Sequence, residues 1–223
     1  INLIIIAMDE ELACLLDALD TYQEVKVINQ KGFLFNRRGE KYLATLGKIG
    51  KVNTAFYLGQ LAQVYNIKKI FNIGTSGGVS KSLNINDVVI AERVRYIDVD
   101  VTGFGYELGQ VPHLPVEYLC DLSSINREEI KTNNYQIHYG LIVSSDSFIT
   151  KNNYNNFPID IYHPLSTEME SGAVMQCAEQ LKIPALVIRS ISDLVFREEN
   201  EKDFDNNIKT ACHNCVEVLL KII

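Results

Sequence analysis

The chain has 223 residues, of which 47% are hydrophobic and 22% are charged, a composition typical of a folded globular protein. The net charge is -7, from 21 basic and 28 acidic residues, which does not favour binding to nucleic acid or to an anionic membrane. We therefore expect a small-molecule partner.

The first part of the chain predicts a strand, a helix and then short strands. Residues 2–8 are an apolar run rich in isoleucine, which is typical of a strand covered on both faces. Residues 9–19 begin with three acidic side chains and continue with helical apolar spacing. Short strands are expected at 25–28, 33–36 and 42–46, where turn-like residues between them indicate hairpins.

The pattern then returns to helix and buried strand. Residues 47–50 contain two glycines and interrupt the strand pattern. Apolar residues at helical spacing predict a helix over 55–62, and the apolar run 70–73 predicts a buried strand. That strand runs into the glycine-rich residues 74–78, which we interpret as a turn.

The second half of the chain alternates in the same way. Strands are expected at 87–96, 139–144 and 185–191, and a helix at about 171–181 between the last two. The clearest helical periodicity covers residues 204–222, which are apolar on one face and charged on the other.

The order of these elements predicts one α/β domain over residues 1–223, with a central mixed β-sheet flanked by helices. No stretch approaches the ~20 apolar residues that span a bilayer, and the apolar run 3–7 is too short for a signal peptide. The five cysteines are scattered and odd in number, which favours buried thiols over a disulfide framework. Cys212 and Cys215 match C-x-x-C but lack a second pair at metal spacing. We expect a cytoplasmic protein without a metal.

Polar residues follow the predicted strands. Ligands of α/β proteins bind at the carboxyl ends of the sheet strands. These segments are residues 7–11, 74–78, 145–149, 168–170 and 189–193. Any one acidic residue among them can simply cap a helix, as we expect for Asp9 and Glu10. Several carboxylates converging on one apolar crevice would instead raise each other's pKa and supply a general acid and a general base.

The glycine-rich segment fits neither common nucleotide motif. It lacks the G-x-G-x-x-G spacing of dinucleotide sites and the Gly-Lys-Ser/Thr of phosphate loops. Its glycines would let the backbone approach a ligand, with hydroxyls from Thr75 and Ser76, but a plain tight turn explains it equally well.

The same segments, in this order, resemble those of the 5'-methylthioadenosine/S-adenosylhomocysteine nucleosidases of the purine nucleoside phosphorylase superfamily. The motifs that carry the resemblance are Ala-Met-Asp-Glu-Glu-Leu (7–12), Gly-Lys-Ile-Gly-Lys-Val (47–52), Asn-Ile-Gly-Thr-Ser-Gly-Gly (72–78), Asp-Val-Asp-Val-Thr-Gly-Phe-Gly-Tyr-Glu (98–107), Glu-Met-Glu (168–170) and Arg-Ser-Ile-Ser-Asp (189–193). Each motif is weak alone, but together they are specific and span nearly the whole chain. The resemblance implies a nucleoside phosphorylase/nucleosidase-like fold.

The resemblance also implies residue roles. Glu11 would be the general base that activates water, Asp193 the general acid that protonates purine N7, and Glu170 the partner of the ribose hydroxyls. The implied nucleoside pocket is lined by Met8, Ile49, Thr75, Ser76, Gly77, Phe148, Ile149, Glu168, Met169, Glu170, Ser192 and Phe204. Within it, Phe148 would stack on adenine, Ile149 would present backbone groups to the adenine edge, and Ser192 would orient Asp193.

Family members are homodimers, and Phe104 and Pro112 would close the 5'-substituent pocket of the partner subunit. No cofactor or metal is implied. The expected reaction is hydrolysis of the N-glycosidic bond of methylthioadenosine and S-adenosylhomocysteine, and of 5'-deoxyadenosine, in methionine salvage. Because a free Asp titrates near ~3.9, we expect the site to raise the pKa of Asp193.

Three alternatives stay open. A phosphorylase of the same superfamily would need cations for phosphate, but Asn72 stands where hexameric phosphorylases carry Arg, and Arg37 and Arg38 look like a solvated turn. A non-catalytic nucleoside-binding module is disfavoured because all three carboxylates are retained. Futalosine-type activity would be a matter of substrate breadth.

Two departures from the family pattern bear on the dimer edge and the 5'-substituent pocket. Ile97 precedes Asp98 where many members have His, and the connection 157–168 is a few residues longer than usual.

Overall fold

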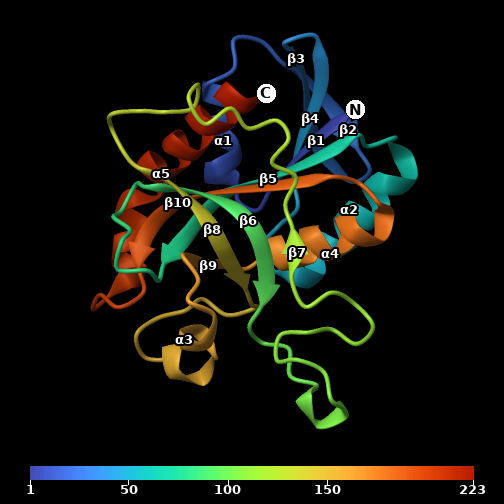
Figure 1. The fold of residues 1–223 in the computed structure, drawn as a ribbon. Helices are drawn as coiled ribbons and strands as arrows, with labels where there is room; N and C mark the ends of the chain where they lie inside the picture. The colour runs from blue at the N-terminus through green and yellow to red at the C-terminus, as the bar shows by residue number, and fades with distance from the viewer.

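Ten strands form one mixed sheet in the computed structural model, which describes residues 1–223 (Figure 1). The strands are β1 (Asn2–Ile6), β2 (Gln23–Val27), β3 (Gln30–Arg37), β4 (Glu40–Leu46), β5 (Lys69–Gly78), β6 (Val88–Tyr96), β7 (Tyr118–Leu119), β8 (Ile137–Ser144), β9 (Ser166–Glu168) and β10 (Ala185–Leu194). Their order is β10-β6-β8-β9-β5-β1-β4-β3-β2, with β7 paired to β6. β1 runs parallel to β4 and β5, whereas β2, β3 and β4 form antiparallel hairpins. The expected mixed sheet is confirmed.

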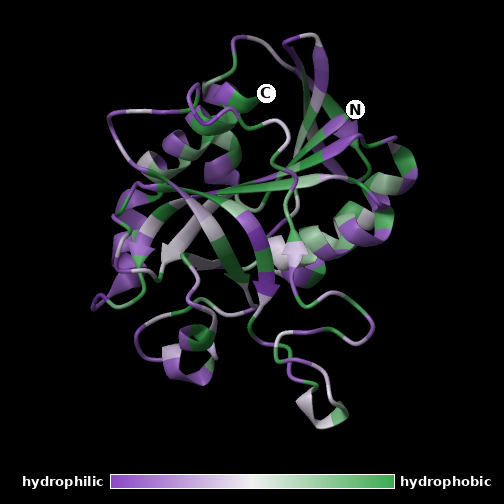
Figure 2. Ribbon diagram, viewed as in Figure 1, coloured by the Kyte–Doolittle hydropathy of each residue, from purple (hydrophilic) through white to green (hydrophobic).

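Helices cover both faces of the sheet. They are α1 (Asp9–Asp17), α2 (Lys51–Val64), α3 (Ile159–Tyr162), α4 (Ser171–Leu181) and α5 (Asn200–Ile222), with 3-10 turns η1 (Thr102–Phe104) and η2 (Tyr154–Asn156). α1 and α5 pack on one face and α2 and α4 on the other (Figure 1). Each pair buries an apolar layer against the strands, and the hydrophilic residues of the helices lie mainly outside (Figure 2). The expected flanking helices are confirmed, and none of them has the length and apolarity needed to cross a bilayer.

Five of the strands close into a ring. β10 pairs with both β5 and β6, β6 pairs with β8, and β9 joins β8 back to β5. The carboxyl ends of β5 and β10 lie side by side, and β9 pairs antiparallel with the end of β5. This arrangement brings three of the motif segments together.

The glycine-rich residues 74–78 are strand, so the predicted turn is wrong. They pair with β10 in parallel, Gly74 beside Arg189 and Gly77 beside Asp193. The register shifts between Ile191 and Asp193, a bulge of the kind that re-aims side chains near active sites. A Cβ at Gly74 would collide with Nη1 of Arg189 and lie 2.6 Å from Oε1 of Glu11, so glycine there allows both side chains to approach the strand closely.

Arg38 and Gly39 form an exposed turn between β3 and β4, as the sequence suggested, whereas Arg37 is the last residue of β3. Arg37 is half-buried, and its Nη2 donates to the carbonyl of Leu220 at 2.7 Å. Nη1 of Arg38 donates to the carbonyl of Lys221 at 3.0 Å. Both arginines therefore cap the C-terminal end of α5, where unpaired carbonyls attract cations.

The cysteines are all free thiols. Cys14, Cys212 and Cys215 are buried between α1, α5 and the sheet, as expected, whereas Cys120 and Cys177 are only half-buried. Burial raises the pKa of Cys212 and Cys215, which leaves them poor nucleophiles.

Candidate active site

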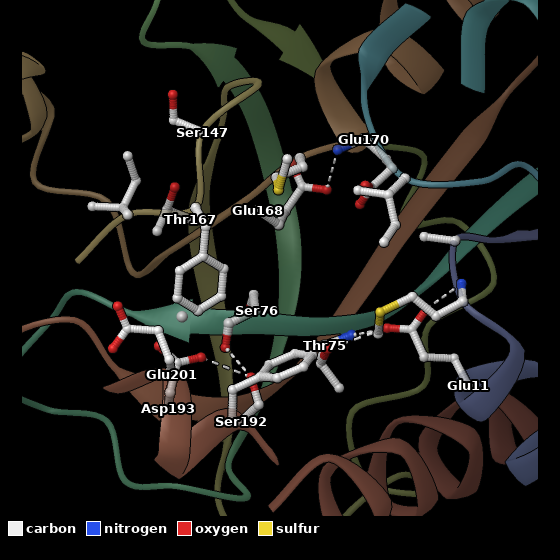
Figure 3. Close-up of a pocket in the computed structure, with 18 of the residues that line it drawn as sticks. Glu11, Thr75, Ser76, Ser147, Thr167, Glu168, Glu170, Ser192, Asp193 and Glu201 are labelled. Atoms are coloured by element: carbon white, nitrogen blue, oxygen red, sulfur yellow. Dashed lines mark hydrogen bonds between the residues drawn. The ribbon is translucent and has the colours of Figure 1, made fainter. Parts of the chain in front are cut away.

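A cavity of about 330 Å³ opens where β5, β9 and β10 end (Figure 3). Its size is at the lower end of the range for small-molecule sites. The residues that line it are Ala7, Met8, Glu11, Ile49, Thr75, Ser76, Gly77, Ser147, Phe148, Ile149, Thr167, Glu168, Met169, Glu170, Ser192, Asp193, Glu201, Phe204 and Asp205. Every residue implied for the catalytic pair and the nucleoside pocket is among them. Phe104 and Pro112 are not.

Glu11 enters the cavity from the first turn of α1. It is 3% exposed, and its Oε1 accepts hydrogen bonds from the backbone N–H (2.8 Å) and the hydroxyl (3.2 Å) of Thr75. The N–H of Met8 donates to its Oε2 at 3.2 Å, which also satisfies an open donor at the helix start. Burial raises the pKa of Glu11, while Arg189 and the three donors act in the opposite direction.

Arg189 is a fully buried cation at the Glu11 end of the cavity. Its Nη2 donates to Oδ1 of Asn72 at 2.7 Å and pairs with Glu168, and Oε2 of Glu170 lies 3.6 Å away. Burial disfavours its charge, but Glu168, Glu170 and Glu11 together raise its pKa. One arginine thus faces three carboxyl groups.

Glu168 is occupied by the protein itself. Its Oε2 accepts the backbone N–H groups of Glu170 and Ser171, and its Oε1 accepts the hydroxyl of Ser171 at 2.6 Å. It therefore holds the start of α4 and pairs with Arg189. Its Oε1 accepts a single hydrogen bond, so this oxygen keeps a second lone pair, and Glu168 lines the cavity.

Glu170 is the freer of the two glutamates. Its Oε1 accepts the N–H of Gly50 at 3.0 Å, which ties the start of α2 to the cavity. Burial and the neighbouring Glu168 raise its pKa, opposed by Arg189. With a single hydrogen bond to the protein, its carboxyl group retains capacity for hydroxyl groups of a ligand.

Asp193 approaches the cavity at the end of β10. Ser192 donates to its Oδ1 at 2.9 Å, and Nδ2 of Asn200 donates to its Oδ2 at 2.8 Å. Burial raises the pKa of Asp193 as expected, opposed by these two donors. The charges that act on it, from Asp203 and Glu201, are acidic and raise the pKa further. This environment favours a protonated acid.

Aromatic side chains form the wall beside Asp193. The rings of Phe148 and Phe204 meet edge to face with centroids 5.9 Å apart. Glu201 and Asp205, from the same helix as Phe204, lie at the exposed rim of the cavity. Figure 3 shows Glu11 and Asp193 on different sides of the view, with Thr75 and Ser76 between them. The space between the two carboxyl groups has apolar walls suited to a flat ring.

Two buried residues of this site had no role in the sequence-based prediction. Arg189 could have been noticed, because a charged residue inside a strand buried on both faces needs a buried partner. Asn200 gave no such signal, because its contact with Asp193 depends on how residues 195–199 turn. No group of three or more His, Cys, Asp or Glu side chains is arranged to hold a metal ion.

Comparison with known proteins identifies relatives over the whole chain. The family model of the Phosphorylase superfamily matches residues 3–223. A 5'-methylthioadenosine/S-adenosylhomocysteine nucleosidase from Listeria monocytogenes is 36% identical over 99% of this chain and 98% of its own length.

Solved structures are similar to the same extent. A crystal structure from Borrelia burgdorferi bound to adenine has a TM-score of 0.93 and 33% identity, over 100% of this chain and 98% of the other. A Streptococcus pneumoniae nucleosidase of this name, with the transition-state inhibitor MT-ImmA, has a TM-score of 0.90 and 33% identity, over 99% of this chain and 96% of the other.

Proposed function

Because the chain belongs to the 5'-methylthioadenosine/S-adenosylhomocysteine nucleosidase family of the phosphorylase superfamily, we propose that it hydrolyses the N-glycosidic bond of both nucleosides. The products are adenine and the 5'-substituted ribose. One observation carries the proposal: Glu11 beside Arg189, and Asp193 without a cation, face the same cavity.

The proposed reaction assigns opposite proton transfers to the two carboxyl groups. Positive charge builds on the ribosyl ring as the bond to purine N9 breaks and its electron pair moves to the base. Asp193 gives its proton to purine N7, so adenine leaves as a neutral molecule. Glu11 takes a proton from water as the water oxygen bonds to the anomeric carbon, as in an inverting glycosidase.

The remaining residues bind the nucleoside in this proposal. Glu170 accepts hydrogen bonds from the ribose hydroxyls, and Phe148 stacks on the base. Backbone groups of Ile149 meet the adenine edge. Met8, Ile49, Gly77, Met169 and Phe204 form the walls around the nucleoside, and Ser192 orients Asp193, supported by its 2.9 Å hydrogen bond.

Hydrolysis is better supported than phosphorolysis. Asn72 donates to the carbonyl of Ile5 and accepts from Arg189, so it offers no charge to phosphate. Arg37 and Arg38 are bound to the end of α5. The charge of Arg189 is met by Glu168 and Glu170, which leaves no free cation for a phosphate ion.

The test is product analysis with methylthioadenosine and S-adenosylhomocysteine, each with and without phosphate. We expect free adenine and the 5'-substituted ribose at rates indifferent to phosphate. A phosphate-dependent sugar 1-phosphate would identify a phosphorylase, and binding without turnover would identify a nucleoside-binding module. Parallel assays with 5'-deoxyadenosine and futalosine measure substrate breadth.

We further propose that the protein is a homodimer. Val52 and Phe56 lie one turn apart on α2 and are 77% and 68% exposed, beside the half-exposed Ile49 of the cavity. Phe104 is 85% exposed on a loop that projects from the sheet (Figure 1). Such apolar exposure fits an interface in which Phe104 and Pro112 of a second copy cover the 5'-substituent.

Light scattering tests this assembly and should give twice the mass of the chain. Val52→Asp with Phe56→Asp should halve that mass, whereas Val64→Asp, an equally apolar exposed position at the other end of α2, should not. A parent protein that scatters as a single chain at micromolar concentration would contradict the dimer.

We place the reaction in methionine salvage, because both nucleosides are by-products of S-adenosylmethionine use. We propose the cytoplasm as its compartment, and the five free thiols support a reducing environment.

A further inference from the structure

Asn200 is a buried amide at the first position of α5. It is 1% exposed and follows Glu199, whose φ of 58° turns the chain into the helix. A polar side chain this deeply buried needs partners inside the protein.

The amide nitrogen of Asn200 joins two segments of the cavity. Its Nδ2 donates to Oδ2 of Asp193 at 2.8 Å and to the carbonyl of Ile149 at 3.1 Å. Since an amide carries two hydrogens on nitrogen, both are used. The carbonyl of Ile149 has a second lone pair, which stays available for an amino group on the edge of a base.

The two hydrogen-bond partners of Asp193 differ in what they can do. The hydroxyl of Ser192 can donate or accept, and the carbonyl of Ser76 is within 3.4 Å for its own proton. The Nδ2 group of Asn200 donates only. Because this group cannot accept a hydrogen bond, the acidic proton of Asp193 cannot point toward Asn200. After the proton has left, the same N–H group stabilises the carboxylate of Asp193.

We propose that Asn200 is a positioning residue that holds the general acid and the base-binding carbonyl of Ile149 in one geometry. The inference rests on the proposed function, since it assumes that Asp193 protonates the base that Ile149 meets.

The surrounding charges make the pH dependence of this contact testable. Glu201 and Asp203 of α5 raise the pKa of Asp193, and Asp203 is itself paired with Arg197 at 3.5 Å. The segments 76–77 and 147–149, which line the same cavity as Asp193, contain no ionisable side chain. Asn200 and Ser192 are the two donors that oppose these effects.

The experiment compares Asn200→Ala with Asn206→Ala, an exposed asparagine six residues further along the same helix. Loss of a hydrogen bond to a charged group should lower kcat by about 10- to 100-fold. Without the donor the pKa of Asp193 rises, so the alkaline limb of the pH profile should move up by about one unit. Asn206→Ala should match the parent in both.

A second variant and a second measurement keep the test decisive. Asn200→Asp is nearly isosteric and places a second carboxyl against Asp193, so it should also raise the alkaline limb and lower kcat. Titration of Asp193 by carboxyl carbon NMR in the ligand-free protein should show the same upward shift. A parent-like pH profile and titration in folded Asn200 variants would overturn the proposal. A parent that releases no adenine would refute the proposed function instead, and the NMR titration would still decide whether Asn200 controls Asp193.

Discussion

The two ends of the cavity treat buried carboxyl groups differently. At one end, Glu11, Glu168 and Glu170 share the guanidinium of Arg189, and backbone N–H groups donate hydrogen bonds to all three. At the other end, Asp193 has a hydroxyl, an amide and further acidic groups around it. Burial raises the pKa at both ends, so burial alone does not separate base from acid. The cation does.

The largest expected effect comes from removing the acid. Asp193→Asn should lower the rate of adenine release by about 10²- to 10⁴-fold, because the nearly isosteric amide has no proton to give. With a 4-nitrophenyl riboside, whose leaving group needs no proton, the loss should nearly vanish. Glu11→Gln should be impaired on both substrates. Steady-state assays of the two variants measure this contrast, and parent-like adenine release by either would refute its assigned role.

Removing the guanidinium of Arg189 should destabilise the end of the cavity that contains Glu11. Arg189→Met leaves Glu168 buried without its partner, which should cost about 3 to 5 kcal/mol in the free energy of unfolding. Urea denaturation measures the loss. Arg93→Met is the control, because its pair with Glu117 is half-exposed and should contribute less than about 1 kcal/mol. Equal losses in the two variants would argue against a role for the buried charge.

A smaller effect is expected from substitution of Gly74, which allows Arg189 and Glu11 to approach closely. Gly74→Ala should force Arg189 and Glu11 apart and cost about 1 to 3 kcal/mol of stability, with lower activity. Gly59→Ala, in an exposed position of α2 with open space around it, should instead stabilise the protein by about 0.5 to 1 kcal/mol. Thermal unfolding of both variants tests this, and a neutral Gly74→Ala would show that the close approach is not required.

The smallest expected effect is a change in how the free energy of unfolding depends on pH. Because the pKa of Glu170 is raised in the folded protein, the unfolded chain releases this proton first as the pH rises above about 4.5. Folding is therefore stabilised less at pH 8 than at pH 5. Glu170→Gln lacks this loss and should gain stability relative to the parent as the pH rises. Identical pH dependence in urea titrations would contradict the raised pKa.

Much of the fold could be predicted because its signals are local. The isoleucine run of β1 and the periodicity of α5 each reflect burial of their own side chains. Residues 74–78 could not be assigned correctly, because glycine there serves the approach of Arg189 and Glu11 rather than a turn. The short elements η1, β7, η2, α3 and β9 were not predicted, and β7 and β9 depend on pairing with distant strands.

The candidate site was predicted through motifs, and its lining agrees with them. The electrostatic partners were harder to predict. The pairing of Arg189 with Glu168 joins β10 to β9, and the contact of Asn200 with Asp193 crosses an irregular turn. Neither pairing follows from spacing along the chain, since the first forms when the ring of strands closes and the second depends on the turn at residues 195–199.

The ring of strands also bears on how the protein behaves at high concentration. Open strand edges can pair with other chains and begin aggregation, and a closed ring removes that risk for its members. The sheet ends instead at β2, where Glu24 and Lys26 are exposed. Charged side chains on an edge strand discourage pairing with a second sheet, so the closure that forms the catalytic cavity leaves few open strand edges at which aggregation could begin.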